Sequence, residues 1–118
     1  MKIIIKDKSK KIKFDNVKKV SEFEKAIGLM FRCRERCPAM LFEFKRQTNI
    51  SIHSLFVFFP FAAVWLDNQN TVVDLKIVKP FQISACSKKS FYKLLEIPLN
   101  KIYSKEIKLL FKNNNYSR

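Results

Sequence analysis

Residues 52–67 read IHSLFVFFPFAAVWLD, and this stretch decides the fold. All twelve residues from 55 to 66 are apolar or proline, whereas a membrane-spanning helix needs roughly 20. Pro60 interrupts any continuous helix, and the Phe, Val and Trp around it favour strands. The stretch therefore predicts two buried strands, residues 50–59 and 62–66, with a kink at Pro60. Strands that are apolar on consecutive positions are covered on both faces. A hydrophobic ligand pocket built on the same strands is the alternative.

The size and composition predict one folded domain spanning residues 1–118. The chain has 118 residues, of which 47% are hydrophobic, with only 1 Gly and 4 Pro. A chain of this length can bury a substantial core, and its composition is that of a globular protein and not of a disordered tail.

The positive charge is concentrated in the two ends of the chain. The net charge is +14. Residues 1–19 hold eight lysines and two aspartates, residues 79–118 hold nine basic and two acidic groups, and residues 47–78 are close to neutral. Such a field attracts polyanions without sequence preference. The alternative is compositional, because 19 lysines stand against five arginines and lysine is the weaker choice for planar, bidentate recognition. The candidate polyanion-binding residues are Lys10, Lys11, Lys13, Lys18, Lys19, Lys88 and Lys89.

The segments on either side of the central stretch mostly show the period-two pattern of strands. The predicted strands outside the centre are residues 2–6, 11–15, 39–44, 71–79 and 91–97. Polar turns are expected at 7–10, 45–49 and 67–70. Within 71–79 we expect Val73, Leu75 and Ile77 on one face of the strand.

Two segments have helical features. Ser21 and Glu24 form a capping box, which predicts a helix over residues 21–31. Residues 104–112 fit either a short helix or a last strand. Seven or eight short strands with one short helix near residues 21–31 indicate a mainly β fold, a small β-sandwich or barrel.

Four blocks of sequence resemble one known family. IGLMFR at 27–32 with AMLFEF at 39–44, the central stretch, VVDLKIVKPF at 72–81 and FYKLLEIP at 91–98 occur in the order and spacing of the bacterial and archaeal domain-of-unknown-function 192 family. The resemblance covers about residues 20–112. It implies a compact β-sandwich with a short helix near its start, and it brings no established activity.

The chain also departs from the family pattern. Ala62 stands where the family places an Asp after the Pro, and Val57 stands where it has the Met of a Phe-Met pair. If that Asp serves a shared site, the site is altered here and the chain is a diverged member.

Few residues in the sequence are suited to catalysis. His53 is the one histidine, so any histidine-based scheme must use it, but a structural histidine bonded to backbone is the favoured interpretation. Cys33, Cys37 and Cys86 could join His53 in a Cys₃His zinc set, although no second closely spaced cysteine pair supports one. Nothing pairs two carboxylates at a catalytic spacing. We hypothesise a structural ion pair between Glu96 and Arg32.

The sequence thus favours a non-enzymatic β domain that binds a small ligand or a protein partner, with a mouth near His53, Arg32 and Trp65. Sequence-nonspecific nucleic-acid binding through the lysine-rich ends is the alternative. We expect no metal, no cofactor and no membrane span. The odd cysteine count and the short apolar run at the N-terminus predict a reducing, cytoplasmic location.

Overall fold

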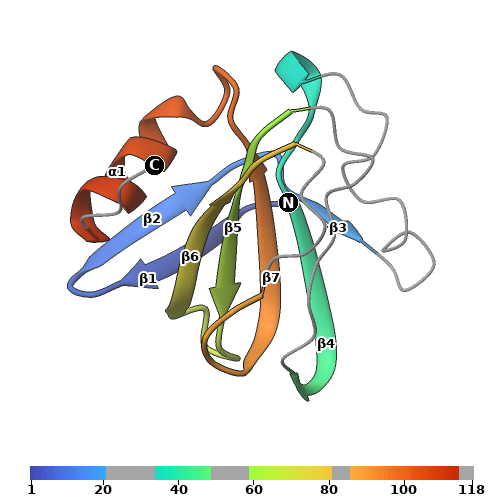
Figure 1. Ribbon diagram of the computed structural model, residues 1–118, viewed down its shortest axis with the longest axis vertical. Coiled ribbons are helices and arrows are strands. Elements are labelled where there is room, and N and C mark those ends of the chain that lie inside the picture. The colour runs from blue at the N-terminus through green and yellow to red at the C-terminus, as the bar shows by residue number, and fades with distance from the viewer. Residues whose placement is uncertain (21–33, 49–58, 81–85, 115–118) are drawn as a thin grey trace.

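A computed structural model describes residues 1–20, 34–48, 59–80 and 86–114 of the chain. The described residues form seven strands in two sheets and one α-helix, and their strands do not close into a barrel (Figure 1). The elements in chain order are β1 (Ile3–Asp7), β2 (Lys10–Phe14), β3 (Lys18–Val20), the short 3₁₀ helix η2 (Arg34–Arg36), β4 (Met40–Thr48), β5 (Phe61–Leu66), β6 (Val72–Val78), β7 (Phe91–Pro98) and α1 (Ser104–Asn114). The predicted mainly β fold is confirmed.

The first two strands, at the positions that the sequence predicts, pair with each other as a hairpin. β1 pairs antiparallel with β2, from Ile3 opposite Phe14 to Asp7 opposite Lys10. Alternate side chains, including Ile5 and Phe14, are buried on the inner face, and the residues between them are exposed on the outer face. The turn residue Lys8 has φ 58°, in the left-handed region.

The other five strands form one sheet in the order β3-β4-β7-β5-β6. β3 runs parallel to β4, and all other neighbours are antiparallel. β5 comes from the central stretch, and every one of its six residues is buried. The prediction of a strand covered on both faces is therefore confirmed for residues 61–66, while residues 50–58 lie outside the described part.

Alternation along these strands divides the core into two layers. We call the layer that faces the hairpin and α1 the hairpin-side core; it contains Leu41, Val64 and Leu95 among others. The layer on the opposite face of the sheet, which we call the far-side core, contains Trp65, Leu94 and others. Nearly every apolar side chain of the sheet thus belongs to one of two packed layers, as in a sandwich.

The segment at residues 104–112, which the sequence allowed to be either a helix or a strand, is a helix. In α1 the residues Ile107, Leu110 and Phe111 are buried in the hairpin-side core at helical spacing, so one stripe of the helix covers the hairpin. The predicted helix at 21–31 falls outside the described residues. No helix of the described part has the length and apolar content that crossing a membrane requires.

Two local predictions are wrong. Residues 45–49 were expected to form a turn, but β4 continues to Thr48, and residue 49 lies outside the described part. This end of β4 is polar and largely exposed, as a turn would be, and it pairs irregularly with β7. Val73, Leu75 and Ile77 of β6 were expected on one face of the strand. Leu75 belongs to the hairpin-side core and Ile77 packs against it, whereas Val73 packs against the far-side core. A register shift in the β5–β6 ladder inserts one extra residue there, and a bulge moves one side chain to the other face.

A buried tyrosine joins three segments that are distant in sequence. The Tyr103 hydroxyl accepts a hydrogen bond from the Ala39 amide at 2.8 Å and lies 3.2 Å from the carbonyl oxygens of Asp15 and Asn16. Burial raises the pKa of Tyr103, which keeps the hydroxyl a donor. This one side chain fixes the start of β4 against the end of the hairpin and the start of α1.

Removing this hydroxyl should destabilise the fold. Tyr103→Phe leaves the Ala39 amide, inside the protein, without its acceptor, and we expect a loss of about 1–3 kcal/mol in the free energy of unfolding. Urea unfolding followed by circular dichroism measures it. Tyr92→Phe, on the half-buried Tyr92 of β7, is the matched control; equal losses in the two variants would contradict a special role for the Tyr103 hydroxyl.

Candidate functional site

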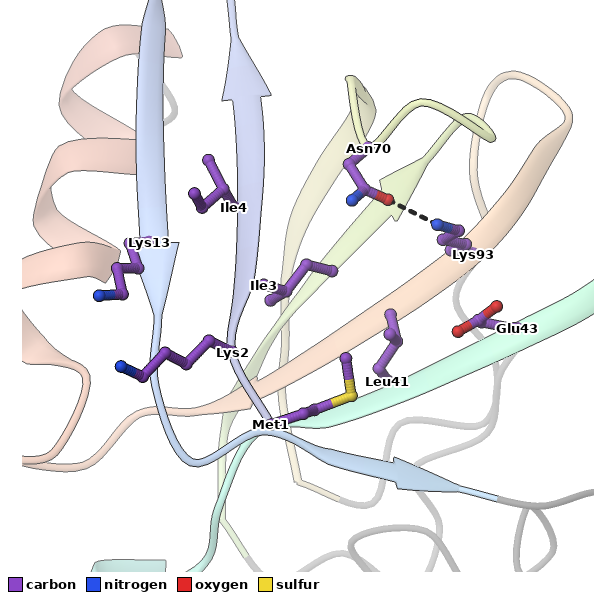
Figure 2. Close-up of a pocket in the computed structure, with 9 residues that line it drawn as sticks. All are labelled: Met1, Lys2, Ile3, Ile4, Lys13, Leu41, Glu43, Asn70 and Lys93. Carbon is purple, nitrogen blue, oxygen red and sulfur yellow. Dashed lines mark hydrogen bonds between the residues drawn. The ribbon is translucent and has the colours of Figure 1, made fainter.

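A hollow of about 490 Å³ lies between the hairpin and the β4–β7 part of the large sheet. Figure 2 shows Lys2, Ile4 and Lys13 on the hairpin side, and Asn70, Lys93 and Glu43 on the sheet side. Met1, Ile3 and Leu41 complete the lining. The hollow exists because the hairpin is joined to the large sheet near β6, where the Lys6 amide donates to the Asn70 carbonyl at 2.8 Å.

The polar groups on the sheet side are held in place by hydrogen bonds and register. The Lys93 ammonium donates to Asn70 Oδ1 at 2.7 Å, the dashed line of Figure 2. Asn70 presents this oxygen from a turn in which its own φ is 65°, a conformation that Asn adopts more readily than most residues. Glu43 lies directly opposite Lys93 in the β4–β7 register, and Lys19 Nζ is 3.4 Å from its carboxylate. Glu43, the one carboxylate among the described lining residues, therefore pairs with a lysine that lies outside the lining.

The apolar part of the lining runs from the core to the surface. Leu41 and Ile3 are buried and belong to the hairpin-side core. Ile4 and Met1 are about half exposed, at 50% and 54%. Ile4 lies opposite Lys13 in the hairpin, so an apolar side chain and an ammonium group stand together on the outer face. The hollow thus has an apolar base of Ile3 and Leu41 and one ammonium group, that of Lys93, on the sheet side, while Figure 2 shows Lys2 and Lys13 pointing away from Lys93.

The described lining residues are mainly lysines and apolar side chains. These nine residues include no histidine, cysteine, serine or threonine, and Glu43 is the one carboxylate among them. General acid–base and nucleophilic chemistry uses such groups most often, and lysine as well, within hydrogen-bonding distance of a substrate. The arrangement is suited to binding.

Two unusual polar groups lie on the opposite face of the sheet. Glu96 of β7 is only 8% exposed and stands between Met40 of β4 and Ala63 of β5 in the register. Burial raises its pKa to about 8. Trp65, one diagonal step away on β5, is fully buried, and its indole Nε1 has no hydrogen-bond partner among the described residues. The far-side core therefore contains a carboxyl that is protonated at neutral pH and an unsatisfied donor.

The site residues predicted for the small ligand fall in different places. His53 and Arg32 lie outside the described residues, so the predicted mouth and the Glu96–Arg32 ion pair stay predictions. Trp65 faces the far-side core, away from the hollow. Ala62, where the resemblance places an Asp, is fully buried in the hairpin-side core opposite Ile97.

Two of the four proposed zinc ligands are also outside the described part. Cys37 is buried with its thiol 3.4 Å from the Pro38 carbonyl oxygen, whereas Cys86 is exposed. Within the described ranges no three ligating side chains form a cluster that could hold a metal ion.

The predicted polyanion-binding lysines lie on three separate segments. Lys10, Lys11 and Lys13 are on the hairpin, Lys18 and Lys19 on β3, and Lys88 and Lys89 in the connection before β7. Figure 1 places these three segments on different sides of the molecule. Lys13 lines the hollow and Lys19 contacts Glu43.

Two further carboxylates, Asp67 and Asp74, have structural contacts. Asp67 accepts hydrogen bonds from the amides of Gln69 and Thr71 in the β5–β6 turn. Asp74 accepts from the amides of Leu75 and Lys88, both at 2.8 Å, and so holds the β6–β7 connection against β6.

Sequence reasoning missed Lys93, Asn70 and Leu41 as neighbours in one site. The one local signal was Lys93, a cation within the apolar strand FYKLLEIP. Its partner Asn70 is 23 residues away in sequence, and only the sheet order brings the two together.

Comparison with known proteins identifies the family. The profile described as an uncharacterized ACR, domain of unknown function 192, matches residues 3–109. This chain belongs to the domain-of-unknown-function 192 family, as the sequence blocks indicate. A UPF0127 protein of Pyrococcus abyssi is 26% identical over 108 residues, which cover 88% of this chain and 92% of that protein.

Solved structures share the fold. A candidate transcription regulator from Sinorhizobium meliloti superposes with a TM-score of 0.71 at 17% identity, covering 89% of this chain and 83% of that one. A protein of unknown function from Novosphingobium aromaticivorans gives a TM-score of 0.68 at 16% identity, covering 88% and 75%. At such identities the likeness establishes the architecture alone.

Proposed function

We propose that this chain is a non-enzymatic binding domain whose hollow takes a small amphipathic anion, a carboxylate or phosphate with an apolar chain. The observation that carries the proposal is a lining that combines the buried apolar side chains of Ile3 and Leu41 with the Lys93 ammonium on the sheet side, and that also includes Lys2 and Lys13 of the hairpin.

The charge of the lining favours an anion. The described lining residues include three lysines and one carboxylate, that of Glu43, and the carboxylate has Lys19 Nζ from outside the lining 3.4 Å away. Lys93 uses one of its three N–H donors on Asn70, which orients the ammonium while leaving donors for a ligand. A hydrogen bond from an oriented ammonium to an anionic oxygen is among the stronger polar contacts in proteins.

The apolar surface favours a ligand with a hydrocarbon part. Ile4 and Met1 are about half exposed and belong to the lining together with buried Leu41. Covering the exposed parts of Ile4 and Met1 with an alkyl chain removes apolar area from water, at about 25 cal/mol per Å². The volume of about 490 Å³ is within the range of ordinary small-molecule sites.

Two finer expectations belong to the same proposal. The cytoplasmic location is supported by the odd number of cysteines. A second binding region at the predicted mouth of His53, Arg32 and Trp65 is supported by the unsatisfied indole of Trp65.

Straight-chain carboxylates test the hollow. Octanoate and decanoate should raise the melting temperature of the protein in a concentration-dependent way, because a ligand that binds the folded state stabilises it. 1-Octanol, which has the chain without the charge, should shift it much less. In Lys93→Gln the dissociation constant for decanoate, measured by calorimetry, should rise about tenfold or more.

Lys105→Gln is the matched control, because it removes one exposed lysine from α1, outside the lining. It should bind decanoate as the parent protein does. The proposal is wrong if carboxylates and phosphates with apolar chains give no stabilisation at millimolar concentration, or if the two variants weaken binding equally.

A further inference from the structure

The outer face of the hairpin is a ribbon of exposed lysines. Lys6 lies opposite Lys11, and Ile4 lies opposite Lys13. Residues two apart on a strand point to the same face, so Lys6, Lys11 and Lys13 share one surface. We call these three residues the lysine ribbon. All three are exposed.

This arrangement places like charges side by side. In an antiparallel pair, directly opposite side chains are about 4.5–5.5 Å apart at Cβ, and like charges there destabilise the strands. In the described part of the chain, neither Lys6 nor Lys11 has a carboxylate within ion-pair distance. Lys13 is 3.9 Å from Asp15, but both side chains are more than half exposed, and such surface pairs contribute little. An external anion would relieve this repulsion.

We propose that the lysine ribbon docks on the phosphate backbone of double-stranded nucleic acid without sequence preference. The charge is complementary to a polyphosphate, and the net charge of +14 adds a long-range attraction. The β1–β2 hairpin that bears these lysines also has a suitable shape, since the major groove of B-DNA admits a two-stranded β-ribbon. The ribbon projects from the large sheet beside α1 (Figure 1).

The chemistry of the ribbon favours a duplex over other polyanions. A membrane-surface site needs an apolar face with residues such as Trp, Phe or Leu, whereas the one large apolar side chain within this face is Ile4. Binding to single strands depends on aromatic side chains on which bases stack. The outward positions of β1 and β2 carry no aromatic side chain. The lysine ribbon would therefore contact nucleic acid through its phosphates.

This inference is separate from the proposed small-ligand function. The two share Lys13, which lies at the edge of the hollow. Lys6 and Lys11 lie outside the lining, and Lys93 is not on the hairpin, so variants at these positions separate the two activities.

Duplex DNA binding at varied salt tests the inference. A fluorescent 20-base-pair duplex of arbitrary sequence is titrated with the full chain between roughly 25 and 200 mM NaCl. The logarithm of the binding constant should fall linearly with the logarithm of salt. In the double variant Lys6→Gln/Lys11→Gln the slope should be smaller by about 2, one unit for each lost phosphate contact, and affinity at the lowest salt should fall at least tenfold.

The matched control is Lys88→Gln/Lys89→Gln, which also removes two exposed lysines but from the β6–β7 connection. It should retain most of the affinity and slope. Equal losses in both double variants would show general attraction by net charge and overturn the ribbon as the site. Absence of binding at 25 mM salt, tighter binding to single strands, or binding to anionic phosphatidylserine vesicles without binding to the duplex would overturn the inference as well.

Discussion

Replacing Glu96 by Gln is expected to raise the free energy of unfolding at pH 7 by about 3 kcal/mol and to change it little near pH 4.5. Burial raises the pKa of the Glu96 carboxyl from an ordinary value of 4.5 to about 8 in the folded protein. Between these values the folded chain holds a proton that the unfolded chain has released. Folding stability therefore falls as pH rises through this interval, by a little over 1 kcal/mol per pH unit.

Gln removes this dependence because it presents a neutral amide at every pH. Urea unfolding of the two proteins at pH 5, 6, 7 and 8 should give a stability difference that grows steadily with pH. Glu35→Gln, at an exposed position in η2, is the control and should show no such trend. A difference that stays constant from pH 5 to 8, or that shrinks, would mean that Glu96 is ionised in the folded protein.

Trp65→Ala is expected to cost about 3–5 kcal/mol, enough to unfold a domain of ordinary stability. Trp65 has the largest fully buried side chain of the described residues. Its ring packs against Phe91, with centroids 6.2 Å apart, and the Lys76 ammonium is 5.8 Å from its centroid. Truncation would leave a large cavity in the far-side core.

Trp65→Phe should be tolerated far better, with a loss below about 1.5 kcal/mol. The smaller ring loses apolar contacts, but the change also removes a buried N–H for which the described residues supply no acceptor, and an unsatisfied buried donor is itself costly. Thermal and urea unfolding of both variants measures the two effects. If Phe were as damaging as Ala, the indole N–H would have to contribute a favourable interaction, which would support a bound ligand or water at this position.

Local patterns predicted the elements whose residues alternate or cluster strongly. The hairpin follows from the apolar run at residues 3–5, a polar turn at 7–10 and alternation over residues 11–15, and β5 follows from an apolar run too short for a membrane helix. The tail of β4 was missed because its exposed side chains are polar, and polarity is the same signal that a turn gives. The bulge that moves Val73 depends on pairing with β5, which no local pattern records.

The candidate site was predictable only in part. Lys13 was singled out for its charge, but its neighbours in the hollow come from β1, β4, β7 and the β5–β6 turn. The Lys93–Asn70 hydrogen bond depends on β7 lying between β4 and β5. Likewise, the pKa of Glu96 depends on burial within β7, whereas the sequence shows only a glutamate in an apolar segment.

Residue types and their order along the chain were enough to establish a mainly β domain of the domain-of-unknown-function 192 family, with a buried central strand and a strongly cationic exterior. These properties follow from composition and short-range periodicity, which act within a few residues. The folded arrangement was needed to show which lysines belong to the lining of the hollow, which form a ribbon on the hairpin, and that Glu96 is held away from water. Each of these depends on strand order and register, because contacts between distant segments form only when the chain is folded.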